Sequence, residues 1–261
     1  MRVIGAAGRL LYVMAVIATV SCGTPAGAQD VAGVIQLAEH DRAVRDPVAA
    51  LRRYEGALAT APTSYELLWR ASREAVDLGE AAPDAAARTR YNAMAEGYAR
   101  RAVSANGAGA DGHFVLAVAL GRTAQSLGSR DRVKYAAEIR SAALDAVRID
   151  PKHAGALHVL GVWNAEVMRL GGLTRFAARN FLGGRIFDQA SWAEARRYME
   201  AAVAADPGRI THRLDLAMIH ADMKQPALAR STCEAVQRMP SVEFNDGRYK
   251  RDCDTLVQRL R

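Results

Sequence analysis

The side chains best suited to catalysis or metal binding are six histidines and three cysteines, which are spread along the chain. None of the histidines stands in an H-E-x-x-H sequence or in a Cys/His spacing typical of a metal site: His40, His113, His153, His158, His212 and His220. No second ligand follows four residues after His158, so a packed or solvent-exposed role is favoured for it over a catalytic one. Asp111 and Glu166 are single acids, so they do not indicate a pair of carboxylates for acid–base chemistry. The sequence therefore predicts neither a metal site nor an enzyme.

Phosphate-binding motifs are also missing from the sequence. No G-x-S-x-G or P-loop sequence occurs, and we expect no dinucleotide fingerprint, which needs a glycine-rich turn directly after a strand. The glycine pairs at 171–172 and 183–184 are interpreted as helix ends because no strand precedes either pair. We therefore expect no cofactor.

The first 28 residues have the polarity of a secretory signal peptide. Arg2 and Arg9 precede an uncharged apolar run at 10–20, and small residues follow it. The run is about half as long as a membrane-spanning helix requires. We expect residues 1–28 to be a signal peptide and residues 29–261 to be the mature domain in the periplasm.

Two processing routes compete at the end of this leader. Ala26, Gly27 and Ala28 suit an ordinary signal peptidase. The sequence Thr-Val-Ser-Cys at 19–22 is similar to a bacterial lipobox, although Thr19 stands where such sequences usually have Leu. The favoured product is soluble, and the second choice is a lipoprotein held at the membrane through Cys22.

The charge balance argues against a nucleic-acid partner. The chain has 35 basic and 28 acidic residues, and loss of the leader with its two arginines lowers the excess from seven to five. The basic pairs at 52–53, 100–101 and 196–197 fall at helical positions beside acids, which favours solvated helix faces. We expect no nucleic-acid binding, and contact with a membrane only if Cys22 is lipidated.

A repeated spacing indicates an all-helical protein. The chain is 50% hydrophobic and 24% charged, is rich in alanine, and has few β-branched runs with period two. One pattern occurs five times: three residues separated by four and then three positions, followed by a Pro or Gly. The spacing predicts a helix with these three residues on one face, and the Pro or Gly predicts where that helix ends. The five sets are Ala50, Tyr54, Ala57 and Pro62; Ala95, Ala99, Ala102 and Gly107; Ile139, Ala143, Ala146 and Pro151; Ala195, Met199, Ala202 and Pro207; and Ala229, Cys233, Val236 and Pro240.

A second kind of segment follows each closing residue and resembles helix A of the tetratricopeptide repeat (TPR). Two sets match the positions of its Trp, Leu, Gly and Tyr: Leu157, Leu160, Gly161 and Asn164; and Arg213, Leu216, Ala217 and His220. The resemblance implies five helical hairpins, the first from 31 to 62, in a right-handed superhelix. Asp46 and Pro47 are expected to begin the second helix, as N-cap and first-turn residues.

An insertion lies in the fourth hairpin. Pro151 and Pro207 are 56 residues apart, against a usual repeat of about 34. An extra amphipathic helix is expected within 167–190, with one apolar face and with arginines on another: Leu173, Phe176, Ala177, Asn180 and Phe181, and Arg175 and Arg179.

This ordered set of segments resembles the regulator of microtubule dynamics proteins and their bacterial TPR relatives. The matching stretches are 66–73, 142–151, 157–163, 177–183, 193–207 and 239–251, and the likeness extends from about 49 to 260. It implies an all-α repeat fold without catalysis. Microtubules are not an expected partner, because an export leader would place the chain beyond their reach.

In a TPR superhelix helix A lines the inner surface, so the resemblance nominates a partner-binding surface. Its residues are Trp69, Arg73, Phe114, Val118, His158, Val162, Leu214 and Met218. We expect an exported scaffold that binds a protein or peptide partner. The alternatives are a periplasmic small-molecule-binding subunit of a solute transporter, and an inner surface covered by the inserted helix.

Two cysteines remain in the mature chain if Cys22 is not lipidated. Cys233 and Cys253 lie about equally far from a turn near 242–245 and would face each other across a helical hairpin. In an oxidising compartment a disulfide between them is expected, with two buried thiols as the alternative.

Overall fold

The computed structural model describes residues 26–171 and 185–260, and the regular structure in these ranges is entirely helical. The eleven α-helices of this part are α1 (Ala26–Ala43), α2 (Pro47–Leu58), α3 (Tyr65–Ala81), α4 (Ala85–Ala105), α5 (Ala110–Gln125), α6 (Ser129–Ile149), α7 (Ala154–Arg169), α9 (Trp192–Ala205), α10 (Ile210–Asp222), α11 (Pro226–Arg238) and α12 (Asp246–Arg259). A short 3-10 helix, η1 (Arg185–Gln189), precedes α9. The predicted all-α fold is confirmed.

Local sequence signals fix where the helices begin and end. Asp46 caps α2 as expected: its Oδ1 accepts the backbone N–H of Ala49 at 2.9 Å, and Pro47 occupies the first turn. Helices α6, α9 and α11 each end two residues before a proline: Pro151, Pro207 and Pro240. Proline has no N–H to continue the helical ladder, so the repeat spacing predicts these ends correctly.

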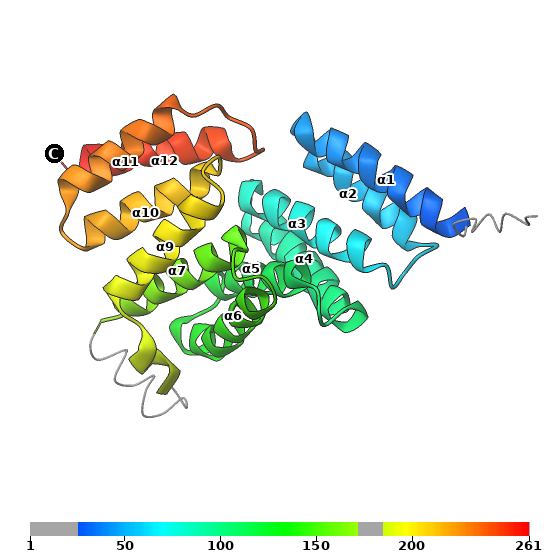
Figure 1. The fold of residues 1–261 in the computed structure, drawn as a ribbon, viewed down its shortest axis with the longest axis horizontal. Helices are drawn as coiled ribbons and strands as arrows, with labels where there is room; N and C mark the ends of the chain where they lie inside the picture. Colours follow the sequence, from blue (N-terminus) through cyan, green and yellow to red (C-terminus); the bar gives the residue numbers. More distant parts are fainter. Residues whose placement is uncertain (1–25, 172–184, 261) are drawn as a thin grey trace, which may run out of the picture.

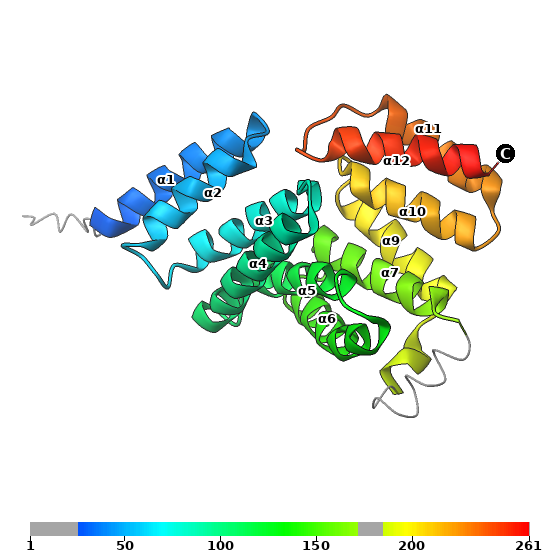
Figure 2. The same ribbon diagram turned by 180° about the vertical axis from the view of Figure 1, so that it is seen from behind.

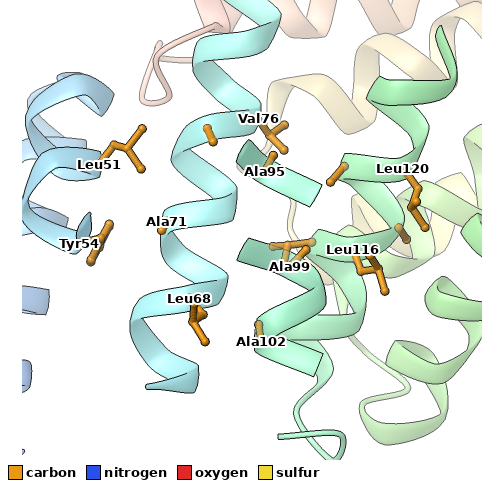
Figure 3. Packing of buried hydrophobic residues seen from close by; sticks show 14 of the residues in the cluster. Leu51, Tyr54, Leu68, Ala71, Val76, Ala95, Ala99, Ala102, Leu116 and Leu120 are labelled. Carbon is orange, nitrogen blue, oxygen red and sulfur yellow. The ribbon is translucent and has the colours of Figure 1, made fainter. Parts of the chain in front are cut away.

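Five antiparallel hairpins follow one another along the chain (Figure 1): α1/α2, α3/α4, α5/α6, α7/α9 and α10/α11, with α12 packed on the last pair. The small residues of the repeat are the contact points inside this stack. Ala95, Ala99 and Ala102 of α4 have no exposed surface, and Figure 3 shows them between α3 and α5. Since alanine has only a methyl group, the backbones of neighbouring helices approach closely there.

Gly161 allows the same close packing on α7, the first helix (helix A) of the fourth hairpin. A Cβ at Gly161 in α7 would lie 3.2 Å from the carbonyl oxygen of Ala195 and 3.0 Å from the Cε of Met199. A glycine at this position therefore lets α9 approach α7 without displacing these atoms, which agrees with the glycine of the TPR pattern.

Gly107, Gly109 and Gly112 have the G-x-G-x-x-G spacing of a dinucleotide motif, yet they join helix α4 to helix α5 and follow no strand. The ring of Tyr65 occupies the space above Gly109 and Gly112: an added Cβ would lie 2.2 Å from it at Gly109 and 2.9 Å from it at Gly112. The Tyr65 hydroxyl accepts the N–H of Gly112 at 2.9 Å. These two glycines therefore make room for an aromatic ring between two repeats.

Several expectations fall outside the described residues. Residues 1–25 of the expected leader, with Cys22, and the residues named for the inserted helix, with Arg175 and Arg179, lie in 1–25 and 172–184, whereas residues 26–28 of the leader form the start of α1. Among the helices that are described, none has both the length and the apolar character needed to cross a membrane.

Candidate functional site: a cavity inside the superhelix

The inner helices surround a cavity of about 870 Å³. Its wall is formed mainly by α3, α5, α7, α10 and α12, with contributions from α6, η1 and the end of α1. All eight residues that the sequence nominated for the inner surface line it: Trp69, Arg73, Phe114, Val118, His158, Val162, Leu214 and Met218. Seven of them are partly or fully exposed, whereas Leu214 is only 5% exposed and packs in a buried cluster; their role in binding stays a prediction.

These eight residues form four pairs, one on each helix A of the second to fifth hairpins. Members of a pair are four residues apart, so they lie one above the other on the same face of their helix. Successive pairs make a mainly apolar band across the wall, and the Met218 side chain is 37% exposed there. The band is the part of the wall that can bury apolar surface of an occupant.

Two aromatic residues of the band also hold neighbouring repeats together. The Phe114 ring covers Gly155 at the start of α7, where a Cβ would lie 2.5 Å from it, and its centroid is 4.8 Å from that of His153. The Trp69 ring carries the guanidinium of Arg70 at 4.1 Å from its centroid and that of Arg73 at 5.3 Å. Such stacking holds the Trp69 ring in a fixed orientation beside the cavity.

Two histidines meet on the wall between α7 and α10. The Nε2 of His158 is 2.6 Å from Oδ2 of Asp215, and its ring centroid is 4.8 Å from that of His212. Burial, together with the nearby His158 and Arg209, lowers the pKa of His212 to about 2. His212 is therefore neutral at physiological pH. Nowhere in residues 26–171 and 185–260 do three or more His, Cys, Asp or Glu side chains gather as a metal ion would require.

Contacts between the two ends of the chain close the cavity on one side. In Figures 1 and 2 the start of α12 lies beside the ends of α1 and α3. We call the polar contacts between these segments the latch: Arg42, Glu74, Asp77 and Glu80 on one side, and Glu243, Asn245, Arg248 and Tyr249 on the other.

Arg42 is the centre of one half of the latch. Its guanidinium lies 2.5 Å from Glu243, 2.7 Å from Asp77 and 2.9 Å from Glu74. Burial alone would lower the pKa of Arg42, but the three carboxylates outweigh it and raise this pKa. Glu74 has no exposed surface, and burial raises its pKa although Arg42 and Arg73 act in the opposite direction.

Glu80 is the centre of the other half. Its carboxylate accepts the Tyr249 hydroxyl at 2.9 Å and pairs with Arg122 at 2.7 Å and with Arg248. Asn245 adds a bond from Nδ2 to the Asp77 carbonyl oxygen at 3.3 Å. No sequence signal marks the latch, because its two sides are about 168 residues apart in the chain and each has the charges of an ordinary solvated helix face.

The two remaining cysteines lie together between α11 and α12. Cys233 and Cys253 are both buried and are present as thiols. A hydrogen bond between them lowers the pKa of the Cys233 thiol and, together with burial, raises the pKa of Cys253. The structure thus brings the two thiols into contact, and the disulfide stays a prediction.

Comparisons with known proteins agree with this architecture. The sequence profile of "Regulator of microtubule dynamics protein 1-3" matches residues 36–261. Among solved structures, TTC0263, a thermophilic TPR protein of Thermus thermophilus, is 19% identical with a TM-score of 0.64, over 87% of this chain and 98% of that chain.

Two further structures are more distant. YrrB, a TPR protein with an unusual peptide-binding site, is 14% identical with a TM-score of 0.43, over 90% of this chain and 97% of that chain. MamA of Desulfovibrio magneticus RS-1 is 15% identical with a TM-score of 0.42, over 80% of this chain and 94% of that chain. Likeness at these identities concerns the fold alone. A search of curated protein sequences finds no match.

Proposed function

This chain belongs to the family of regulator of microtubule dynamics proteins 1-3, and on that premise we propose that it is a non-catalytic scaffold whose inner cavity binds a segment of a protein partner. The observation that supports this most is the shared position of the eight inner residues on one wall. Four helices each contribute two side chains to it, so a partner can be contacted along the second to fifth hairpins. Trp and Arg are among these residues, and both are enriched where interfaces gain most of their binding energy.

The proposal includes export from the cytoplasm. The basic, apolar and small-residue order of residues 1–28 supports a signal peptide, with the lipobox-like Cys22 as the alternative route. Cell fractionation with mass spectrometry of the mature N-terminus tests it. An N-terminus at Gln29 supports the first route and a lipidated Cys22 the second, whereas an intact Met1 in the cytoplasm would refute export.

One observation favours a second function, the binding of a small molecule for a solute transporter. The latch closes the superhelix, and a volume of about 870 Å³ lies within the range of small-molecule sites, about 300–1,000 Å³. A peptide partner would leave the cavity at both sides, whereas a small molecule would be enclosed.

A pull-down with paired variants tests the scaffold. Met218→Asp places a charge on the cavity wall, and Leu228→Asp places the same charge on α11, where the leucine is 48% exposed and lies outside the cavity wall. We expect the first variant to lose its envelope partner and the second to retain it, with both remaining folded by circular dichroism. Equal recovery of the partner by both variants would show that the cavity is not the binding site.

A further inference from the structure

Two buried hydrogen-bond acceptors on the cavity wall have no partner in the part of the chain that the structure describes. They are Nδ1 of His212 and Oδ1 of Asp246, whose residues are 3% and 2% exposed. A buried polar atom without a hydrogen bond has lost its contact with water and gained nothing in return. An occupant that brings a hydrogen-bond donor to these atoms would therefore be stabilised there.

The hydrogen bonding of His212 decides which of its ring nitrogens accepts. The ring forms a hydrogen bond to the backbone of Ala202, and because Nδ1 has no partner, this bond is made by Nε2. Nε2 therefore carries the proton and Nδ1 presents a lone pair. Since His212 is neutral at physiological pH, Nδ1 is available as an acceptor under these conditions.

Asp246 is a buried carboxylate whose hydrogen bonds go to the backbone. Its Oδ2 accepts the N–H of Val242 at 2.8 Å and that of Glu243 at 2.7 Å. Among the described residues, no ion pair joins Asp246 to a cationic side chain, and its Oδ1 is unbonded. A buried negative charge without a cation is costly. A positively charged donor at Oδ1 would supply both the missing hydrogen bond and the missing charge.

The two acceptors belong to one region of the wall. Arg209 and Glu243 form an ion pair of 2.9 Å between the starts of α10 and α12. His212 and Asp246 follow these two residues by three positions each, and α10 packs on α12. The wall residues within 206–252 carry more acids than arginines, so the region attracts a cation: Asp206, Asp215, Glu243, Asp246 and Asp252, against Arg209 and Arg248.

The two arginines of this region are already neutralised by carboxylates. Arg209 pairs with Glu243 and lies 3.5 Å from Asp206. Arg248 donates through both terminal nitrogens to Glu80, which leaves only its Nε without a partner among the described residues. An anionic occupant would meet these carboxylates as well as the guanidinium groups, which disfavours it.

We propose that this region of the cavity binds a primary ammonium group, which donates to Oδ1 of Asp246, while Nδ1 of His212 accepts a further N–H of the occupant. The ammonium is carried by a lysine of the partner segment or by a small alkyl amine, whose carbon chain contacts Val162 and Met218. This rests on the proposed function and adds the chemistry of the occupant. The latch residues Asn245 and Arg248 flank Asp246, so opening of the latch gives the amine access to it.

Isothermal titration calorimetry with matched probes tests the charge. The probes 1,4-diaminobutane, 1,4-butanediol and succinate carry ammonium, hydroxyl and carboxylate ends on chains of equal length. Acetyl-Gly-Lys-Gly-amide and the same peptide with norleucine present an ammonium on a peptide or omit it. We expect the diamine, the lysine peptide or both to bind at least tenfold more tightly than the uncharged counterpart, and succinate not to bind.

The same probes distinguish the two sources of the ammonium. Binding of the lysine peptide without binding of the diamine would assign the ammonium to a protein partner. Binding of the diamine without the lysine peptide would assign it to a small amine. Both results support the ammonium site.

Protein variants locate the binding. In Asp246→Asn the amide oxygen can keep the bonds from Val242 and Glu243, which places an NH₂ donor at the free position, so amine binding should weaken at least tenfold. Asp254→Asn is the control: it makes the same charge change on α12, at an exposed residue outside the cavity wall, and should stay within twofold. If Asp246→Asn fails to fold, His212→Phe decides, because it removes the second acceptor and keeps a ring.

The outcomes separate this inference from the proposed function. Equal binding of the diol and the diamine would overturn the positive charge, and so would a preference for succinate. Amine binding that is unchanged in both Asp246→Asn and His212→Phe, or that is absent from the unmodified protein, would overturn the site. In each case the scaffold stands as long as Met218→Asp loses the partner in the pull-down, whereas retention of the partner there rejects the scaffold itself.

Discussion

His212 shows how a single buried side chain ties stability to pH. Its side chain lies in the wall between α7 and α10 and is 3% exposed, and burial lowers its pKa to about 2. In the unfolded chain its pKa is that of ordinary histidine, about 6.5. The unfolded state therefore takes up a proton first as the pH falls, while the folded state stays neutral.

This linkage predicts a loss of stability in acid. Between pH 7.5 and 5.5 the contribution of His212 to the free energy of unfolding should fall by about 1 kcal/mol, and it is fully present only above the unfolded pKa. Urea unfolding at both pH values measures it. His212→Leu should reduce the difference by this amount, whereas His40→Gln, at an exposed position, should not. An equal pH dependence in His212→Leu and the unmodified protein would contradict the assignment.

At the scale of the helix, the repeat spacing predicts most of what the structure contains. A four-three spacing of small residues specifies a buried face, and the proline that follows specifies an end, so both features are encoded within about a dozen neighbouring residues. Ala143 and Ala146 on α6 and Ala195 on α9 are buried for this reason. The cavity residues could be nominated in the same way, since helix A faces inward in every unit.

The small-residue face of α4 gives a direct test of this packing. Ala99→Leu adds three carbons where the side chain is fully buried between α3 and α5, and such overpacking should cost about 1–3 kcal/mol of stability. Ala93→Leu, on the exposed face of the same helix, should change stability by less than about 0.5 kcal/mol. Urea unfolding followed by circular dichroism measures both. A larger loss for Ala93→Leu would show that the faces are assigned wrongly.

At the scale of the whole molecule, the closure of the superhelix could not be predicted from the sequence. Whether Arg42 reaches Glu243 depends on the angles between five successive hairpins. Local sequence patterns do not encode the total rotation to which these angles add up. The charges of the latch are typical of solvated helix faces. They acquire a joint role only because the curvature of the stack brings the start of α12 to the end of α3 (Figure 2).

The ion pairs that Glu243 forms in the latch should therefore control how far the superhelix opens while adding little to its stability. Glu243, Arg42 and Arg209 are partly exposed, and ion pairs of this kind contribute about 0–1 kcal/mol each and are weakened by salt. Glu243→Arg would place a third positive charge beside Arg42 and Arg209. We expect this variant to have a larger radius of gyration in small-angle X-ray scattering, with an unchanged helical circular dichroism signal. The unmodified protein in 1 M salt should change in the same direction.

Glu138→Arg is the matched control for this experiment. It breaks an ion pair of comparable length, 2.7 Å to Arg100, that joins α4 to α6 inside the stack and involves neither end of the chain. Its radius of gyration should equal that of the unmodified protein, because helix packing holds α4 and α6 in place. If Glu243→Arg and high salt also leave the scattering profile unchanged, the packing of α3 to α10 fixes the closed form and the latch follows from it.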